Sequence, residues 1–213
     1  KNKNAEFNIL QIKPMSNIGI NQKKSDINKE LIFTRSTHSL GNGYFDEIND
    51  LIMINSNTFN PTRSVEIAQE ISDLNKTFKN KNQYIICGPG RWGSADHWLG
   101  IPVSWDQISQ AKIFIEIGRN DLPIEPSFGS HFFQNITSLH VAYITIDPKI
   151  RNDILNLDWL SQDNLKQSGK YVDWYRFNQP FLATLNGMTG AGIIYQPKPE
   201  TPEMMDEEES SGI

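Results

Sequence analysis

Residue types and spacings that could do chemistry concentrate in one glycine-rich stretch, residues 84–94 (YIICGPGRWGS). Gly88, Gly90 and Gly93 have the spacing G-x-G-x-x-G, which in dinucleotide-binding proteins lets the backbone approach a pyrophosphate. Gly88 and Gly93 also give G-x-x-x-x-G, the frame of a phosphate-binding P-loop. The spacing therefore raises the question of whether this stretch binds a nucleotide.

Neither nucleotide motif is complete. A dinucleotide site needs a helix that opens at the third glycine, but Gly100 and Pro102 occupy its second and third turns. Proline costs about 3 kcal/mol in a helix interior and glycine about 1. Glu116 does lie about where a ribose-binding carboxylate would stand, so a dinucleotide-binding enzyme stays as an alternative. A P-loop needs Lys and then Ser or Thr after its second glycine, and Ser94 and Ala95 stand there instead.

Arg91 is the side chain of this loop best suited to hold a ligand. Its planar guanidinium matches the geometry of a phosphate or a carboxylate, and Trp92 and Ser94 are its neighbours. The alternative is a structural turn in which Arg91 pairs with an internal carboxylate such as Asp96 or Glu116. The sequence leaves both interpretations open.

A second polar stretch, residues 125–135 (EPSFGSHFFQN), offers the rest of a pocket wall. In a functional interpretation His131 acts as acid, base or ligand. In the alternative, the polar side chains cap a turn into a half-buried segment. The combined prediction is a pocket for a small anionic substrate or effector, with this lining: Arg91, Trp92, Ser94, Ser130, His131 and Asn135.

Composition excludes several other classes of site and partner. The chain has 213 residues, a net charge of −5 and one cysteine, Cys87. The charge argues against a nucleic-acid partner, and one cysteine excludes a disulfide framework and favours a reducing, cytoplasmic location. No apolar run approaches the roughly 18 residues of a membrane span. His38, His97 and His140 have no partners at ligand spacing, so no metal site is predicted.

A strand–helix–strand unit is predicted to position the glycine loop. An apolar strand at 50–55 precedes a helix from Pro61 to Phe78, with Asn60 as its N-cap, and a second strand at 82–88 ends in the loop. Such a unit implies parallel strands and places the loop at their carboxyl edge, where ligands usually bind. The apolar stripe expected to pack on the sheet is Val65, Ile67, Ala68, Ile71, Leu74 and Phe78.

The remaining elements complete a fold of the α/β (or α+β) class, with a mixed sheet, the βαβ unit and late antiparallel strands. One α/β domain is predicted over residues 31–197. It follows a terminal strand at 1–15 and a linker at 16–30, and precedes an acidic disordered tail at 198–213. Further strands are expected at 31–37, 112–117, 139–146, 171–177, 181–185 and 192–195, with a glycine loop at 39–45, one helical turn at 106–111, one or two short helices at 153–167 and a hairpin turn at 185–192.

The N-terminal segment carries a resemblance to a known family. Residues 7–15 (FNILQIKPM) resemble the last strand of the ATP-grasp domain of the pyruvate phosphate dikinase and phosphoenolpyruvate synthase family, which ends in Gln-x-Arg-Pro. Gln11 and Pro14 match, and Lys13 stands where the family has arginine. The resemblance implies that Gln11 lies beside the metal–nucleotide site and that Lys13 faces a phosphate of ATP without the bidentate fork of arginine.

The stretches GPGRWGSADHWLGIPVSW and EPSFGSHFFQN resemble the C-terminal region of bacterial phosphoenolpyruvate synthase-like proteins. This resemblance implies an ATP-dependent phosphotransferase whose upstream ATP-grasp domain binds ATP and Mg²⁺ and is the partner of this region. The chain starts inside a strand, lacks the family's phosphohistidine motif around His38 and is too short for the phosphoenolpyruvate-binding barrel. We therefore expect a fragment that is not catalytically complete alone; the alternatives are a non-catalytic docking or regulatory module and a dinucleotide-binding enzyme.

Overall fold

The computed structural model describes residues 27–55, 58–78, 83–118 and 140–197. The predicted strand at 1–15, most of the linker and the acidic tail lie outside these residues, and five of the predicted site residues do so too: Gln11, Lys13, Ser130, His131 and Asn135. Arg91, Trp92 and Ser94 are described.

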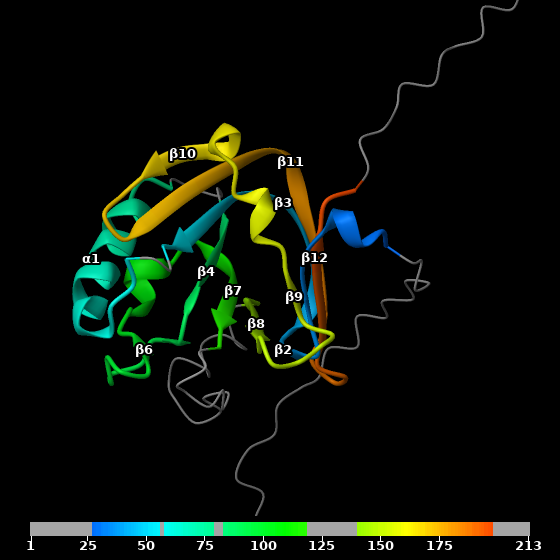
Figure 1. The fold of residues 1–213 in the computed structure, drawn as a ribbon, viewed down its shortest axis with the longest axis horizontal. Helices are drawn as coiled ribbons and strands as arrows, with labels where there is room; N and C mark the ends of the chain where they lie inside the picture. The colour runs from blue at the N-terminus through cyan, green and yellow to red at the C-terminus, as the bar shows by residue number, and fades with distance from the viewer. Residues whose placement is uncertain (1–26, 56–57, 79–82, 119–139, 198–213) are drawn as a thin grey trace, which may run out of the picture.

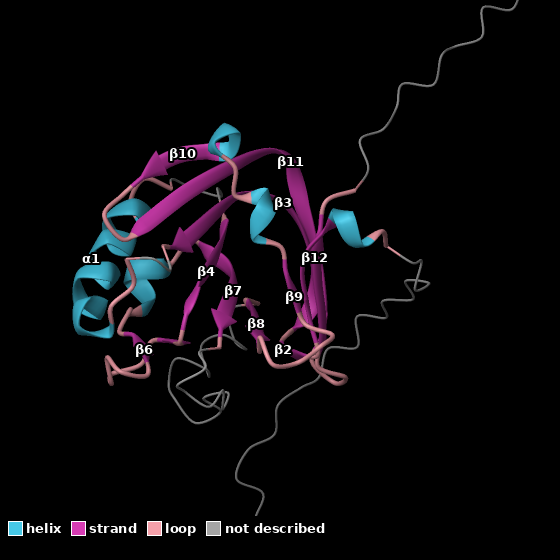
Figure 2. Cartoon of the chain, viewed as in Figure 1, coloured by secondary structure: helices cyan, strands magenta, loops and turns pink. Residues whose placement is uncertain are grey.

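Strands are the most common element of the described chain, and the helical elements are short apart from one (Figures 1 and 2). The helical elements are η1 (Lys29–Leu31), η2 (Pro61–Arg63), α1 (Ser64–Asn75), η3 (Trp105–Ile108), η4 (Leu157–Trp159) and η5 (Gln162–Asn164). The strands are β1 (Ile32–Ser36), β2 (His38–Leu40), β3 (Asn42–Ile54), β4 (Tyr84–Pro89), β5 (Arg91–Trp92), β6 (Gly100–Ile101), β7 (Ala111–Ile117), β8 (Ala142–Ile146), β9 (Ile154–Leu155), β10 (Leu165–Ser168), β11 (Val172–Asn186) and β12 (Ala191–Tyr195).

The predicted βαβ unit is confirmed, and the sheet is mixed. β3, β4, β7 and β8 run parallel side by side, while β1, β9, β10, β11 and β12 join the sheet in antiparallel pairs. The sheet order is β2-β8-β7-β4-β3-β11-β12-β1-β9, with β10 beside β11. The carboxyl ends of β4, β7 and β8 therefore lie at one edge of the sheet.

The helix predicted from Pro61 to Phe78 forms as two elements, the 3-10 turn η2, which Asn60 caps, and α1, which ends at Asn75. The Asn60 side chain accepts a hydrogen bond from the Thr62 backbone, and Pro61 stands in the first turn. Ile67, Ala68, Ile71, Leu74 and Phe78 are buried as predicted.

Val65 is a correction to this stripe, because 69% of it is exposed. Residues that are two positions apart in an α-helix, such as Val65 and Ile67, lie about 200° apart around the helix axis. Val65 therefore faces away from the sheet that Ile67 contacts.

Three further predictions needed correction. Residues 39–45 are not a loop, because only Gly41, with φ of +93°, turns the chain between β2 and β3. The runs at 171–177 and 181–185 belong to one strand, β11, whose pairing with β3 shifts between Arg176 and Phe181. The segment at 153–167 holds two single helical turns, as predicted, but also β9 and part of β10.

The junction between β1 and β2 brings the two ends of the sheet together. β1 and β2 are separated only by Thr37, yet β1 pairs with β12 and β2 pairs with β8. β2 also contacts β11 and β12, and β1 contacts β8. The Ser36 hydroxyl donates to the Thr145 carbonyl (2.5 Å) across this junction. The sheet is therefore curled, and a separate hydrophobic core lies on each of its two faces.

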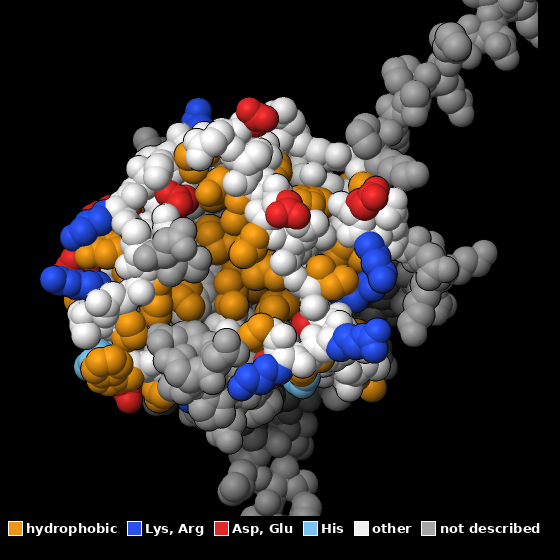
Figure 3. Space-filling model, viewed as in Figure 1, with side chains coloured by type: hydrophobic (Ala, Val, Ile, Leu, Met, Phe, Trp, Pro, Cys, Tyr) orange, Lys and Arg blue, Asp and Glu red, His pale blue; other side chains and the backbone are white. Residues whose placement is uncertain are grey.

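The two cores follow from this curl. One fills the space between α1 and the outer face of the sheet and includes Ile71, Tyr84 and Phe114. The other lies on the opposite face and includes Phe33, Cys87 and Phe181. In Figure 3 hydrophobic side chains gather in the middle of the view over the strands, and charged side chains lie around the rim.

Cys87 in the second core is expected to be chemically inert in the folded protein. Its side chain is fully buried on β4, and burial raises the pKa of its thiol well above the usual range. Since the thiolate is the reactive form, iodoacetamide should label Cys87 only after unfolding in urea, as read by mass spectrometry. Ala95→Cys, on an exposed part of the glycine loop, is the control and should react in the folded state. Rapid labelling of native Cys87 would contradict the burial.

Candidate functional site

The glycine loop leaves the carboxyl edge of the parallel strands and forms a small sheet of its own. β5 and β6 are parallel, with Arg91 opposite Gly100. The Gly90 backbone N–H donates to the Ile117 carbonyl (3.0 Å), which ties the loop to the end of β7. Residues 94–99 form turns, and no helix begins at Ser94. The helix that a dinucleotide site requires is therefore missing.

The glycines have steric roles in this small sheet. A Cβ at Gly100 would lie 1.9 Å from the Arg91 carbonyl oxygen, and one at Gly90 would lie 2.8 Å from the Leu99 carbonyl oxygen. Gly90 and Gly93 also have φ of +74° and +73°, which only glycine adopts readily. The close approach of β5 and β6 thus accounts for glycine at 90 and 100, and backbone conformation accounts for it at 93.

Two of the predicted pocket residues, Trp92 and Ser94, make hydrogen bonds to other residues of the protein. Trp92 is 3% exposed, and its indole Nε1 donates to the Ile115 carbonyl (3.1 Å). Its ring lies over Gly88, where a Cβ would approach it to 3.0 Å. The Ser94 hydroxyl donates to the Asp96 carbonyl (2.9 Å). Trp92 therefore packs in the core, and Ser94 closes a local turn.

Arg91, in contrast to the buried Trp92, is half-buried and lies at the carboxyl edge of the parallel strands. Among the described residues no carboxylate lies within ion-pair distance of its guanidinium, Asp96 and Glu116 included. Its charge nevertheless lowers the pKa values of Glu116 and Tyr143, although burial outweighs this effect in both. Arg91 is thus a cation close to a buried carboxyl group but not paired with it.

Glu116 and Tyr143 form a buried pair beside Arg91. Their side chains come from the adjacent parallel strands β7 and β8, and the Tyr143 hydroxyl donates to a Glu116 carboxylate oxygen. Both residues are less than 10% exposed. Burial raises the pKa of Glu116, and burial together with the Glu116 charge raises the pKa of Tyr143 well above 10. Tyr143 could not be singled out from the sequence because it lies in a mostly apolar strand.

The raised pKa of Glu116 predicts a pH-dependent effect of Glu116→Gln. The folded pKa exceeds the unfolded value of about 4.5, so the wild type loses stability as pH rises through the folded pKa. The variant does not titrate and keeps an acceptor for Tyr143. The free energy of unfolding of the variant relative to wild type should therefore rise between about pH 4 and pH 8 in urea denaturation. Glu47→Gln, at an exposed position, should show no such rise; a flat difference for Glu116→Gln would refute the assigned shift.

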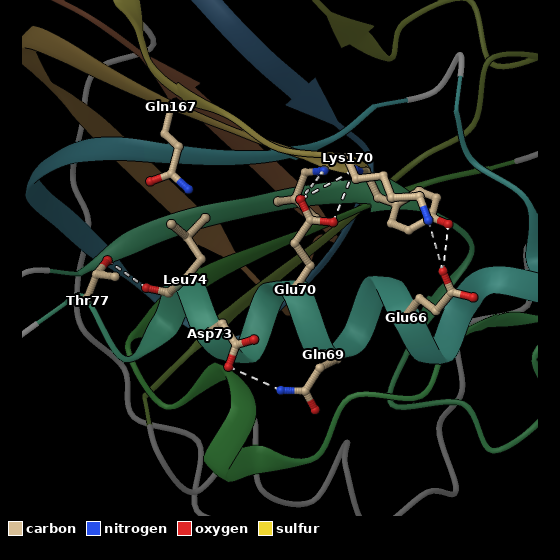
Figure 4. Close-up of a pocket in the computed structure, with 10 residues that line it drawn as sticks. Glu66, Gln69, Glu70, Asp73, Leu74, Thr77, Gln167 and Lys170 are labelled. Atoms are coloured by element: carbon tan, nitrogen blue, oxygen red, sulfur yellow. Dashed lines mark hydrogen bonds and ion pairs between the residues drawn. The ribbon is translucent and has the colours of Figure 1, made fainter.

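A groove of about 390 Å³ lies between α1 and the turn that joins β10 to β11 (Figure 4). Its lining includes Glu66, Glu70 and Asp73, which follow one face of the helix, and Lys170 and Tyr171 from the turn. The spacing i, i+4, i+7 of the three acids is a sequence signal that could have identified this face.

The carboxylates of this groove already have partners. Glu70 accepts hydrogen bonds from the backbone N–H groups of Tyr171 (3.1 Å) and Val172 (3.3 Å). Glu66 accepts from the Tyr171 hydroxyl (2.8 Å) and pairs with Arg63 and Lys170, and these contacts lower its pKa to about 2. These hydrogen bonds and ion pairs therefore hold the β10–β11 turn against α1.

Within the described residues, no group of three or more His, Cys, Asp or Glu side chains is placed to hold a metal ion. The same part of the chain contains no helix that is long and apolar enough to cross a membrane.

The strongest candidate site is thus the carboxyl edge of the parallel strands, where Arg91 lies beside the Glu116–Tyr143 pair. Comparisons of the chain with protein-family models, with curated proteins and with solved structures found no match.

Proposed function

We propose that the chain is the C-terminal region of a phosphoenolpyruvate synthase-like, ATP-dependent phosphotransferase and binds an anionic substrate or effector at the carboxyl edge of its parallel strands. It does not turn over ATP alone, because phosphoryl transfer needs nucleotide, metal and acceptor held together. ATP and Mg²⁺ belong to the upstream ATP-grasp domain in this proposal. Only Gln11 and Lys13 of this chain would contribute there, and both lie outside the described residues.

The charge balance around Arg91 carries the proposal. A half-buried guanidinium without a carboxylate partner in the described structure can accept an anion. An ionised Glu116 would oppose an anion, and burial raises the pKa of Glu116, which disfavours its ionised form. The Tyr143 hydroxyl is already directed to Glu116. The edge therefore favours a phosphate or carboxylate over a cation.

Calorimetric titration with inorganic phosphate, phosphoenolpyruvate and ATP tests this proposal. Arg91→Gln should weaken binding of the preferred anion about tenfold or more, since a charge-assisted hydrogen bond contributes about 1.5–3 kcal/mol. Arg63→Gln is the matched control: Arg63 is exposed and paired with Glu66 on α1, so its loss should leave the affinity unchanged. Equal binding by wild type and Arg91→Gln, or binding by neither, would remove Arg91 from the site.

A docking module is the second candidate, and one observation favours it. Trp98, in the turns that follow Gly93, is 56% exposed, and its backbone N–H donates to the Asp96 carboxylate (2.9 Å). The His97 ring lies 5.1 Å from the indole, centre to centre. Exposed tryptophan is enriched among residues that dominate protein–protein binding. Trp98→Ala should then abolish binding to a separately produced ATP-grasp domain while anion binding at Arg91 persists; unchanged association would exclude docking through Trp98.

A further inference from the structure

A second cleft, of about 250 Å³, lies between the η4–η5 segment and strands β11 and β12. In Figure 1 the η4–η5 segment is yellow and lies near β11, whereas β6 is drawn at the lower left of the view. Its lining contains two aromatic rings and four side-chain amides and no charged side chain: Trp159, Asn164, Phe177, Asn178, Gln179 and Gln196. The cleft is therefore chemically unlike the cationic edge at Arg91.

Hydrogen bonds fix the orientation of three of these amides. The side-chain nitrogen of Asn164 donates to the Trp159 carbonyl (3.3 Å), that of Gln179 to the Pro197 carbonyl (2.7 Å) and that of Gln196 to the Gln179 carbonyl (2.5 Å). A backbone carbonyl only accepts, so the nitrogen and not the oxygen must face it. The three amide oxygens accept no hydrogen bond from the described residues, and each belongs to a side chain that lines the cleft.

The aromatic side of the cleft is held rigidly. The Trp159 ring is stacked on Phe181, with centroids 6.0 Å apart and planes 19° apart, and it also contacts Phe33 and Phe177. Trp159 is nevertheless half-buried, since the cleft lies beside it. Phe177 is buried beneath the same region. The cleft thus combines an aromatic wall with three side chains whose amide oxygens accept no hydrogen bond from the described residues.

We propose that this cleft binds a neutral, polyhydroxylated ligand of the size of one sugar ring. Three fixed acceptors call for a ligand that donates several hydrogen bonds, as hydroxyl groups do. The apolar face of a sugar ring matches the Trp159 indole. A charged ligand is disfavoured because nothing in the lining would compensate its desolvated charge. This binding site is independent of the anion site at Arg91.

Protein NMR titration of the full chain tests the proposal, with glucose, N-acetylglucosamine, maltose and chitobiose as probes. At least one sugar should shift the indole N–H signal of Trp159 saturably while the signal of Trp98 stays fixed. Gln196→Met and Gln179→Met, which keep the side-chain volume, should each weaken that sugar about fivefold, the loss of one hydrogen bond. Gln162→Met, at an exposed position outside the lining, should bind as wild type.

Two results would overturn the sugar assignment. The first is the absence of a saturable shift of Trp159 with all four sugars in the wild-type protein, which needs no variant to fold. The second is tighter binding of a charged probe, inorganic phosphate or arginine methyl ester, at Trp159. Loss of phosphate binding in Arg91→Gln with unchanged sugar binding would separate this site from the anion site.

Discussion

Gly100→Ala is expected to destabilise the domain by about 3 kcal/mol or more, at the upper end of what overpacking costs. The added Cβ would stand 1.9 Å from the Arg91 carbonyl oxygen and 2.6 Å from its carbonyl carbon and amide nitrogen. All three are backbone atoms, so no side-chain rotation can relieve the clash. β5 and β6 must separate, and the separation removes support from the buried Trp92.

Urea denaturation of wild type, Gly100→Ala and Ser94→Ala measures this effect. Ser94→Ala removes one hydrogen bond in the same loop and should cost no more than about 1 kcal/mol. Anion affinity should fall in Gly100→Ala, because the backbone of Arg91 moves. A Gly100→Ala variant as stable as wild type would show that β5 and β6 can accommodate a Cβ at position 100, and would contradict the steric role of this glycine.

Asp50→Ala should cost about 2 to 3 kcal/mol of stability, below the usual 3–5 for a broken buried pair because its arginine partner is partly solvated. The Asp50 carboxylate is 5% exposed and accepts from Trp174 Nε1 (2.7 Å) and from Nε (2.8 Å) and Nη2 (2.9 Å) of Arg176. Arg176 is 44% exposed and also lies over the Trp174 ring. These contacts join β3 to β11 at the amino end of the parallel strands.

A double-mutant cycle with Arg176→Ala isolates the pair in urea denaturation. The coupling energy should be about 1–2 kcal/mol, within the range for residues in one network. Asp46→Ala, at an exposed position of the same strand, should change stability by no more than about 0.5 kcal/mol. Strict additivity of the Asp50 and Arg176 substitutions would show that the ion pair contributes nothing beyond its separate residues.

The elements defined by local chemistry could be predicted from the sequence. Asn60 and Pro61 identify the start of the helical segment η2–α1, the apolar spacing identifies its buried face, and the runs on either side identify the parallel strands. The glycine stretch at 39–45 misled, because Gly41 separates β2 from β3 and Gly43 lies within β3, and these segments pair with β8 and β11, about 100 or more residues away. Long-range pairing of this kind leaves no local signature.

The candidate site could be predicted from the sequence only in part, for the same reason. The missing helix after Gly93 follows from Gly100 and Pro102, and Arg91 stands at the strand edge as predicted. Tyr143 and the amide cleft depend on which strands become neighbours. The burial of Trp92 depends on a contact with Gly88, four residues away, that only the fold reveals.

The strand pairs on either side of Thr37 also constrain the order in which the domain can assemble. β1 pairs with β12, and the Gly187 backbone N–H donates to the Asn42 side chain across 145 positions of sequence, so these contacts form only after the chain has been made up to β12. Chains dominated by such distant pairing fold slowly, and unpaired strands favour aggregation meanwhile. During synthesis β1 therefore lacks its longer partner, β12, until nearly the whole domain has been made.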